Sequence, residues 1–166
     1  MRRAGLLLLA LLAGPAQAAW QWDAPLEVST AVGPAIFPHV ESANRQGLAV
    51  AGGTVGVVWE DNRSGAPRCY VAYRPATAPA FAAEADLSAG ECYEPAIAPL
   101  DGAGRFLAAW EEDGAVWVRA LPGGNPVRLS VSTAAQATLA THGNQAYVAW
   151  AEQAGRFKRI VVAALA

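Results

Sequence analysis

The residues best suited to chemistry are acidic side chains that follow three tryptophans. They are Glu60 and Asp61 after Trp59, Glu111, Glu112 and Asp113 after Trp110, and Glu152 shortly after Trp150. Paired carboxylates a few ångströms apart can divide the acid and base roles of glycoside hydrolysis. Acidic residues in turns are more often solvated or paired with a cation, and Arg63 and Arg105 are available as such cations. We therefore favour a structural role for these acids and assign no catalytic residue.

Motifs of other enzyme classes are missing from the sequence. It contains no Gly-x-Ser-x-Gly elbow, no phosphate-binding loop and no metal-binding helix. Neither His39 nor His142 stands at a spacing that would complete a zinc site with the two cysteines. We therefore favour a non-enzymatic protein and predict no metal and no cofactor.

Five aromatic side chains are candidates for binding. Aromatic rings can stack on sugar rings or become buried in a protein partner. The candidates are Trp22, Tyr70, Tyr73, Tyr93 and Trp117. The alternative for each of them is a place in the hydrophobic core. The expected partner is an unidentified protein or a carbohydrate.

The two cysteines, Cys69 and Cys92, are expected to form a disulfide bond. An even pair in an exported chain more often forms a disulfide than a metal site or a nucleophile. The bridge would close a loop of about 24 residues, which the chain-entropy model values at about 3 kcal/mol. It would also restrain the Pro- and Ala-rich connection at residues 75–85.

The N-terminus predicts export. Met1-Arg2-Arg3 precedes an apolar run at residues 5–13, and Ala16-Gln17-Ala18 is typical of a signal peptidase site. The apolar run is too short for a membrane anchor, which needs about 18 residues. We therefore predict a signal peptide at residues 1–19 and one periplasmic or secreted domain at residues 20–166. No membrane anchor is expected after cleavage.

The mature chain is mildly acidic. The formal net charge is −2 and becomes −4 when Arg2 and Arg3 are removed with the signal peptide. The remaining arginines are not clustered into a basic stripe. Nucleic acid is therefore not expected as a partner.

Short apolar runs separated by turn residues predict an all-β protein. No long stretch keeps apolar residues at helical spacing. The runs recur in the same order in three units, at about residues 28–75, 87–121 and 129–165. A repeat of about 40 to 50 residues is typical of propeller blades. The residues that define the repeat are Trp59, Glu60, Asp61, Trp110, Glu111 and Trp150.

The first unit resembles the blades of sialidase-like β-propellers. The resemblance rests on the run Val58-Trp59-Glu60-Asp61-Asn62-Arg63-Ser64-Gly65 and on the following strand, which ends in Tyr70. It implies four-stranded antiparallel blades packed face to face around a central axis. It extends over about residues 28–165 but is sharp only in the first unit.

The sequence also departs from that family. The Ser-x-Asp-x-Gly-x-Thr-Trp hairpin of true sialidases has no match, and their three arginines and tyrosine–glutamate pair cannot be placed on this chain. Closed propellers generally need four or more blades. The expected fold is therefore a propeller-like repeat of about three four-stranded antiparallel blades, with a β-sandwich as the alternative.

The expected function is that of an exported, non-enzymatic binding or assembly module. The alternative is a sialidase-like, glycoside-acting enzyme whose site is completed by oligomerisation. Residues 24–29 resemble the strand that ends a blade, whereas the third unit stops at Ala166 without its own last strand. Two chains could therefore close a six-bladed ring as a homodimer. An open half-propeller bound to another protein is the rival arrangement.

Overall fold

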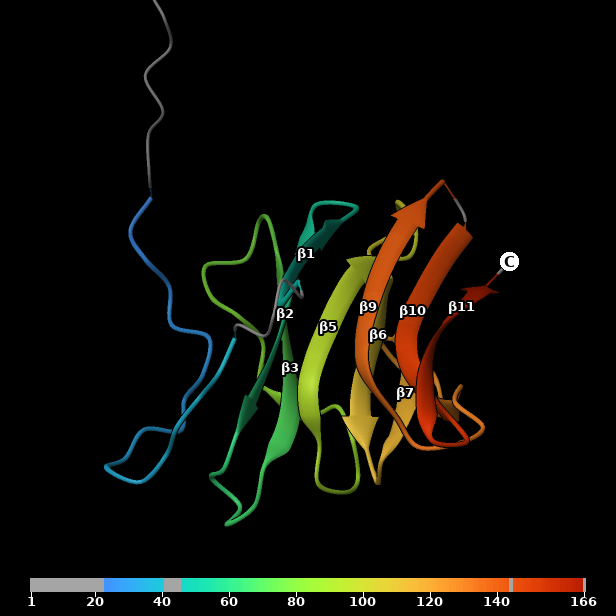
Figure 1. Cartoon of the computed structure of the whole chain (residues 1–166). Coiled ribbons are helices and arrows are strands. Elements are labelled where there is room, and N and C mark those ends of the chain that lie inside the picture. The colour runs from blue at the N-terminus through green and yellow to red at the C-terminus, as the bar shows by residue number, and fades with distance from the viewer. Residues whose placement is uncertain (1–22, 41–45, 144, 166) are drawn as a thin grey trace, which may run out of the picture.

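The computed structural model describes residues 23–40, 46–143 and 145–165. These residues form β-strands and no helix, in three antiparallel sheets that stand side by side (Figure 1). Sheet 1 contains β1 (Leu48–Ala51), β2 (Thr54–Asp61), β3 (Arg68–Pro75) and β4 (Ala85–Asp86). Sheet 2 contains β5 (Tyr93–Pro99), β6 (Phe106–Glu112), β7 (Ala115–Leu121) and β8 (Val127–Arg128). Sheet 3 contains β9 (Ala134–His142), β10 (Gln145–Ala154) and β11 (Phe157–Leu165).

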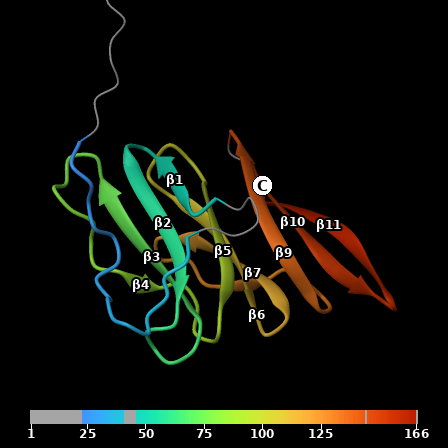
Figure 2. The same ribbon diagram turned by 60° about the vertical axis from the view of Figure 1, so that its left-hand side comes forward.

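The all-β prediction is confirmed, and the propeller expectation is corrected in part. The sheets hold four, four and three strands, and the described residues form an open row rather than a closed ring (Figure 1, Figure 2). The predicted signal peptide and Trp22 lie outside the described residues. Among the described residues, no helix is long and apolar enough to cross a membrane.

The three sheets repeat one strand register. The tryptophans of β2, β6 and β10 stand opposite equivalent positions of the next strand, in the pairs Trp59 with Tyr70, Trp110 with Trp117, and Trp150 with Val161. Side chains alternate between the two faces of a strand. We call the face that carries the repeat tryptophan the rear face of a sheet and the opposite face its front face.

Both faces of sheet 2 are buried, because the sheet packs between its two neighbours. Phe106 and Trp110 on its rear face belong to a core shared with Val58 and Val71 of sheet 1. Leu107, Ala109 and Val116 on its front face belong to a second core, shared with Val148 and Trp150 of sheet 3. A strand buried on both faces needs a nearly continuous apolar run, such as Phe106-Leu107-Ala108-Ala109-Trp110.

The predicted disulfide between Cys69 and Cys92 is present. Both side chains are fully buried in the core between sheets 1 and 2. Cys69 lies on β3, and Cys92 directly precedes β5. The bridge therefore ties the third strand of sheet 1 to the start of sheet 2.

Residues 23–40 run along the rear side of sheet 1 (Figure 2). Val28 packs against the cluster that contains Trp59 and Tyr70. The Arg63 guanidinium donates a hydrogen bond to Ser29 Oγ at 3.0 Å. The backbone N–H of Thr30 donates to Glu84 Oε1 at 2.7 Å. These contacts fix the segment on the sheet.

Candidate functional site

The acids that directly follow the first two tryptophans join neighbouring sheets. Glu60 Oε2 accepts the backbone N–H of Glu94 at 3.1 Å, and Glu111 Oε1 accepts that of Gln136 at 2.5 Å. Glu94 and Gln136 have positive φ angles of 52° and 63°, and both adjoin irregularities in strand pairing. A bulge leaves an N–H group outside the ladder. Each carboxylate therefore satisfies a donor released by the first strand of the following sheet.

The acids two positions after the tryptophans accept hydrogen bonds from the tryptophan of their own strand or from the loop that leads into their sheet. The indole N–H groups of Trp59 and Trp110 donate to Asp61 Oδ2 at 3.1 Å and to Glu112 Oε2 at 2.8 Å. Glu112 Oε1 also accepts the backbone N–H of Gly90, in the loop before sheet 2, at 3.0 Å. Glu152 accepts two backbone N–H groups of the loop before sheet 3 at 2.8 and 3.1 Å but no indole N–H. The indole nitrogen of Trp150 is buried and has no hydrogen-bond partner among the described residues.

Asp61 is held in its charged form. Burial raises its pKa, but hydrogen bonds from the side chain and backbone of Arg63 and from the Trp59 indole outweigh burial, so the pKa is lowered overall. Arg63 also forms an ion pair with Glu84 at 2.6 Å. These contacts give Asp61 a structural role at the edge of sheet 1.

The lowered pKa of Asp61 predicts acid-sensitive stability. Its carboxylate contributes fully above the ordinary pKa of an aspartate and loses its contribution as the pH falls through the lower, folded-state pKa. We expect the free energy of unfolding to fall between about pH 5 and pH 2 by a smaller amount in Asp61→Asn than in the unchanged chain. Urea unfolding followed by tryptophan fluorescence at each pH measures this difference. Parallel pH profiles would contradict it.

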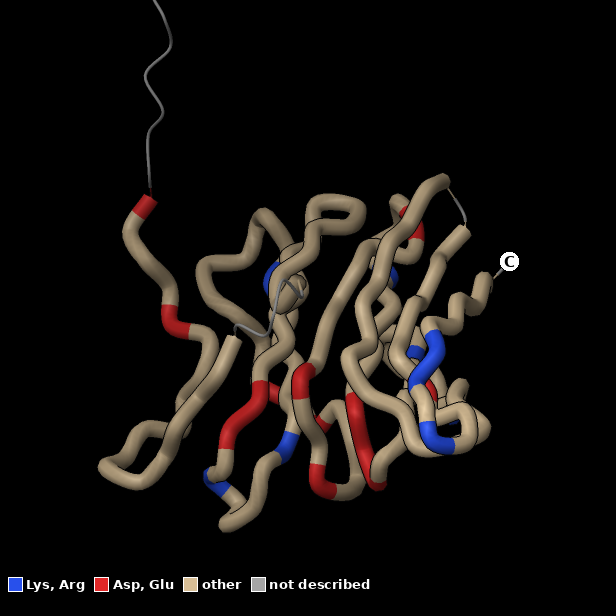
Figure 3. The backbone as a smooth tube through the Cα atoms, viewed as in Figure 1, with Lys and Arg blue, Asp and Glu red and all other residues tan. Residues whose placement is uncertain are grey.

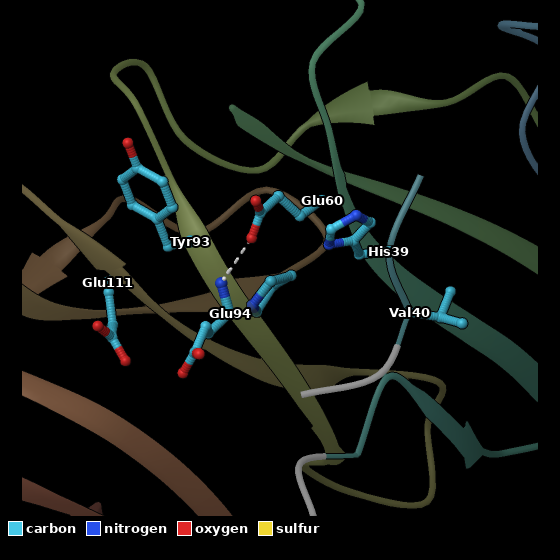
Figure 4. Close-up of a pocket in the computed structure, with 7 residues that line it drawn as sticks. His39, Val40, Glu60, Tyr93, Glu94 and Glu111 are labelled. Atoms are coloured by element: carbon cyan, nitrogen blue, oxygen red, sulfur yellow. Dashed lines mark hydrogen bonds between the residues drawn. The ribbon is translucent and has the colours of Figure 1, made fainter. Parts of the chain in front are cut away.

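A pocket opens between the end of β2 in sheet 1 and the start of β5 in sheet 2 (Figure 4). Its volume is about 380 Å³. It is lined by His39, Val40, Glu60, Tyr93, Glu94, Pro95 and Glu111. His39 is positioned by two backbone hydrogen bonds with Glu60, at 2.6 and 2.9 Å. The hydrogen bond from the Glu94 N–H to Glu60 Oε2 joins two residues that line the pocket.

Among the predicted binding aromatics that the structure describes, Tyr93 alone lines this pocket. Its hydroxyl donates to Glu91 Oε2 at 2.8 Å, and this hydrogen bond raises the pKa of Tyr93. A tyrosine–glutamate contact is therefore present, although none of the seven lining residues is an arginine. Within the described ranges, no group of three or more His, Cys, Asp or Glu side chains is arranged to hold a metal ion.

The other predicted aromatics within the described residues pack inside the protein. Tyr70 stacks on Trp59 with ring centroids 5.8 Å apart. Tyr73 stacks on Phe106 at 5.8 Å. The Trp117 indole donates to the carbonyl oxygen of Glu112 at 3.2 Å. These rings contribute to cores and turns rather than to the pocket.

The front face of sheet 3 is a second candidate site. At its centre the face carries Tyr147, Ala149, Ala151, Ile160, Val162 and Ala164, and Thr138, His142, Gln145, Gln153 and Lys158 share the face around them. These six central side chains are apolar or aromatic, although the face belongs to the last sheet of the row (Figure 1).

No protein-family model, curated protein or solved structure matches this chain.

The repeat register shows how unusual this exposure is. Ile160 stands at the position of Cys69 in sheet 1 and of Val116 in sheet 2. The relative exposure is 75% for Ile160 and 0% for both equivalents. Val162 is 62% exposed, whereas its equivalent in sheet 1, Val71, is 3% exposed. The centre of the front face of sheet 3 therefore exposes apolar side chains of the kind that pack between sheets elsewhere in the protein.

Proposed function

We propose that this chain is an exported, non-enzymatic assembly module that binds a protein partner on the front face of sheet 3. The observation that carries the proposal is the exposure of Ile160 and Val162, because their equivalents Cys69, Val116 and Val71 are buried and their remaining equivalent Val118 is half-buried. A contiguous exposed apolar patch marks an interaction surface in soluble proteins. The partner covers the patch as sheet 2 covers the front face of sheet 1.

The free edge of β11 supports the same function. Within the described chain, β11 pairs with β10 along one side and with no strand along the other. An unpaired edge exposes backbone N–H and C=O groups that can pair with another chain. The edge adjoins Ile160 and Val162, so one partner can cover both features.

The disulfide supports function outside the cytosol. Disulfides persist in oxidising compartments and are rare in cytosolic proteins. The bond between Cys69 and Cys92 is fully buried between two sheets, so it belongs to the folded architecture. The periplasm or the extracellular space supplies the conditions for this bond.

The pocket gives weaker support to the glycoside-acting alternative. The Tyr93–Glu91 contact favours that alternative. However, Glu60 and Glu111 already accept backbone N–H groups of the neighbouring sheets, and no lining residue is an arginine that could bind a substrate carboxylate. Assembly through sheet 3 is therefore the better-supported function.

Site-specific photo-cross-linking in the cells that naturally export the chain tests the proposal. A benzophenone amino acid replaces Ile160 on the front face of sheet 3 or, as the control, Val131. Val131 is 82% exposed in the loop before sheet 3 and lies off that face. We expect irradiation to yield a protein adduct from position 160 and none from position 131. Absence of an adduct from position 160 would reject the assembly function.

A further inference from the structure

We propose that the partner is a second copy of this chain, whose sheet 1 packs its rear face on the front face of sheet 3. In the same contact, Leu26 and Glu27 of the second copy add a fourth strand to β11. The inference rests on the proposed function and names its partner. Four features of the described residues support it: the N-terminal segment, the strand register, the rear face of sheet 1 and the distribution of charge.

The N-terminal segment corresponds to the connections between sheets. In sheets 1 and 2, the fourth strands β4 and β8 lead directly into Leu87-Ser88 and Leu129-Ser130. Leu87 and Leu129 pack in the two inter-sheet cores. Val28-Ser29 follows Leu26 and Glu27 in the same way, and Val28 packs against the rear cluster of sheet 1. Leu26 and Glu27 are therefore placed as a fourth strand, but they pair with no sheet of their own chain among the described residues.

Among the described residues, sheet 3 lacks the fourth strand that sheets 1 and 2 have. Sheets 1 and 2 have four strands each, whereas the third strand of sheet 3, β11, is its outermost one. The N-terminal segment and β11 lie at opposite ends of the row (Figure 1, Figure 2). Leu26 and Glu27 therefore cannot reach β11 of their own chain, but they can reach β11 of a second copy arranged head to tail.

The repeat register predicts the pairing between the two copies. In sheet 1 the fourth strand pairs through Val71 with Ala85, and in sheet 2 it pairs through Val118 with Val127. The equivalent of Val71 and Val118 in sheet 3 is Val162. The corresponding residue of the N-terminal segment, two positions before Val28, is Leu26. Leu26 of one copy therefore stands opposite Val162 of the other.

The rear face of sheet 1 is open along its β1 edge, whereas Trp59 and Tyr70 at its centre are buried beneath Val28. Leu48 and Val50 on β1 are 53% and 56% exposed. The residue of sheet 2 in the register position of Leu48 is Ile97, which is fully buried in the core with sheet 1. In sheet 3 the same position is held by Leu139, which packs against the core shared with sheet 2. The β1 edge of sheet 1 and the front face of sheet 3 thus expose residues at positions that form the interface between successive sheets.

The charges of the two ends are complementary (Figure 3). In the pairing above, Glu27 stands opposite Val161 and two residues from Arg159, which also forms an ion pair with Glu152 of its own sheet; Arg156 and Lys158 lie at the same end of β11. Opposite charges favour a head-to-tail approach of two copies over contact between identical ends. Two copies supply six sheets, which lies within the range of four to eight that closed rings use. A two-fold operation then satisfies both open ends of both chains.

Light scattering coupled to size exclusion tests the second copy with the mature chain, residues 20–166. We expect a mass of two chains for the unchanged protein, one chain for Ile160→Lys, and two chains for the control Val131→Lys. Ile160 and Val131 are both largely exposed, so neither substitution disturbs a core. A mass of one chain for the unchanged protein would reject the second copy, and so would a two-chain mass that Ile160→Lys leaves intact.

The cross-linking experiment separates this failure from failure of the proposed function. An adduct from position 160 with a different protein, together with a one-chain mass, would retain the assembly function and reject the second copy. A one-chain mass without any adduct would reject both.

An engineered disulfide tests the register. The variant Leu26→Cys with Val162→Cys is expected to give a covalent two-chain species on a non-reducing gel after mild oxidation. Leu26→Cys with Phe157→Cys is the control, because Phe157 lies at the far end of β11. Equal yields from the two variants, or none from the first, would contradict the predicted pairing.

Discussion

Replacing Cys69 and Cys92 together by alanine is expected to lower the free energy of unfolding by about 3 kcal/mol or more. The bridge joins residues separated by 23 positions, and the chain-entropy model values the closure of such a loop at about 3 kcal/mol. Both sulfur atoms also fill a fully buried site between sheets 1 and 2, so the double variant leaves a small cavity. Typical domains are stable by about 5–15 kcal/mol, so this loss is a large fraction of the total.

Urea unfolding followed by tryptophan fluorescence measures this effect. The unchanged chain with its bridge reduced is the matched control, because it loses the loop constraint but keeps both sulfur atoms. We expect the reduced chain to lose nearly as much stability as the double variant. A loss below about 1 kcal/mol in both samples would show that the bridge does not stabilise the fold.

The architecture could be predicted because it depends on local pattern. Trp59, Trp110 and Trp150 recur with the same flanking runs, and this order indicated repeated antiparallel sheets. The pairing of Cys69 with Cys92 was also accessible, since an exported chain with two cysteines offers one intramolecular pairing.

The pocket could not be predicted, because it depends on contacts between sheets. Glu94 and Gln136 adopt positive φ angles without being glycine, so the sequence gives no sign of the bulges that bring their N–H groups to Glu60 and Glu111. His39 reaches the pocket through an isolated bridge to β2, far from Tyr93 in the sequence. A comparison of the residues at equivalent repeat positions could have marked Glu94 and Gln136 as related.

The predicted aromatics illustrate a second limit. Both faces of β3 are covered, the front face by sheet 2 and the rear face by Val28 and Phe81, so a tyrosine on either face becomes part of a core. Tyr70 and Tyr73 lie on opposite faces of β3, and each stacks on another aromatic ring. Tyr93 differs because it begins β5, ahead of the bulge at Glu94, and it remains 38% exposed. Position along the strand, rather than residue type, decides which aromatic reaches the pocket.

Truncating Trp110 to alanine is expected to lower the free energy of unfolding by about 3–5 kcal/mol, because a fully buried indole is removed from the core between sheets 1 and 2.

Replacing Trp110 or Trp150 by phenylalanine separates the hydrogen bond of the indole from its packing. Trp110→Phe loses the hydrogen bond to Glu112 at 2.8 Å, whereas Trp150→Phe loses none, since its indole nitrogen has no partner among the described residues. Hydrogen bonds to charged groups contribute about 1.5–3 kcal/mol. We therefore expect Trp110→Phe to be the costlier substitution by about 1–2 kcal/mol.

This difference distinguishes two roles of the repeat tryptophan. If the residue served only to fill space, Trp110→Phe and Trp150→Phe would cost the same, because both indoles are almost completely buried on rear faces. Glu112 and Glu152 both accept backbone N–H groups of the preceding loop, but only Glu112 also accepts the indole N–H of its tryptophan. Equal losses of stability in urea unfolding would contradict this account. A larger loss for Trp110→Phe would show that the tryptophan–acid pair stabilises sheet 2 through its hydrogen bond as well as through its packing.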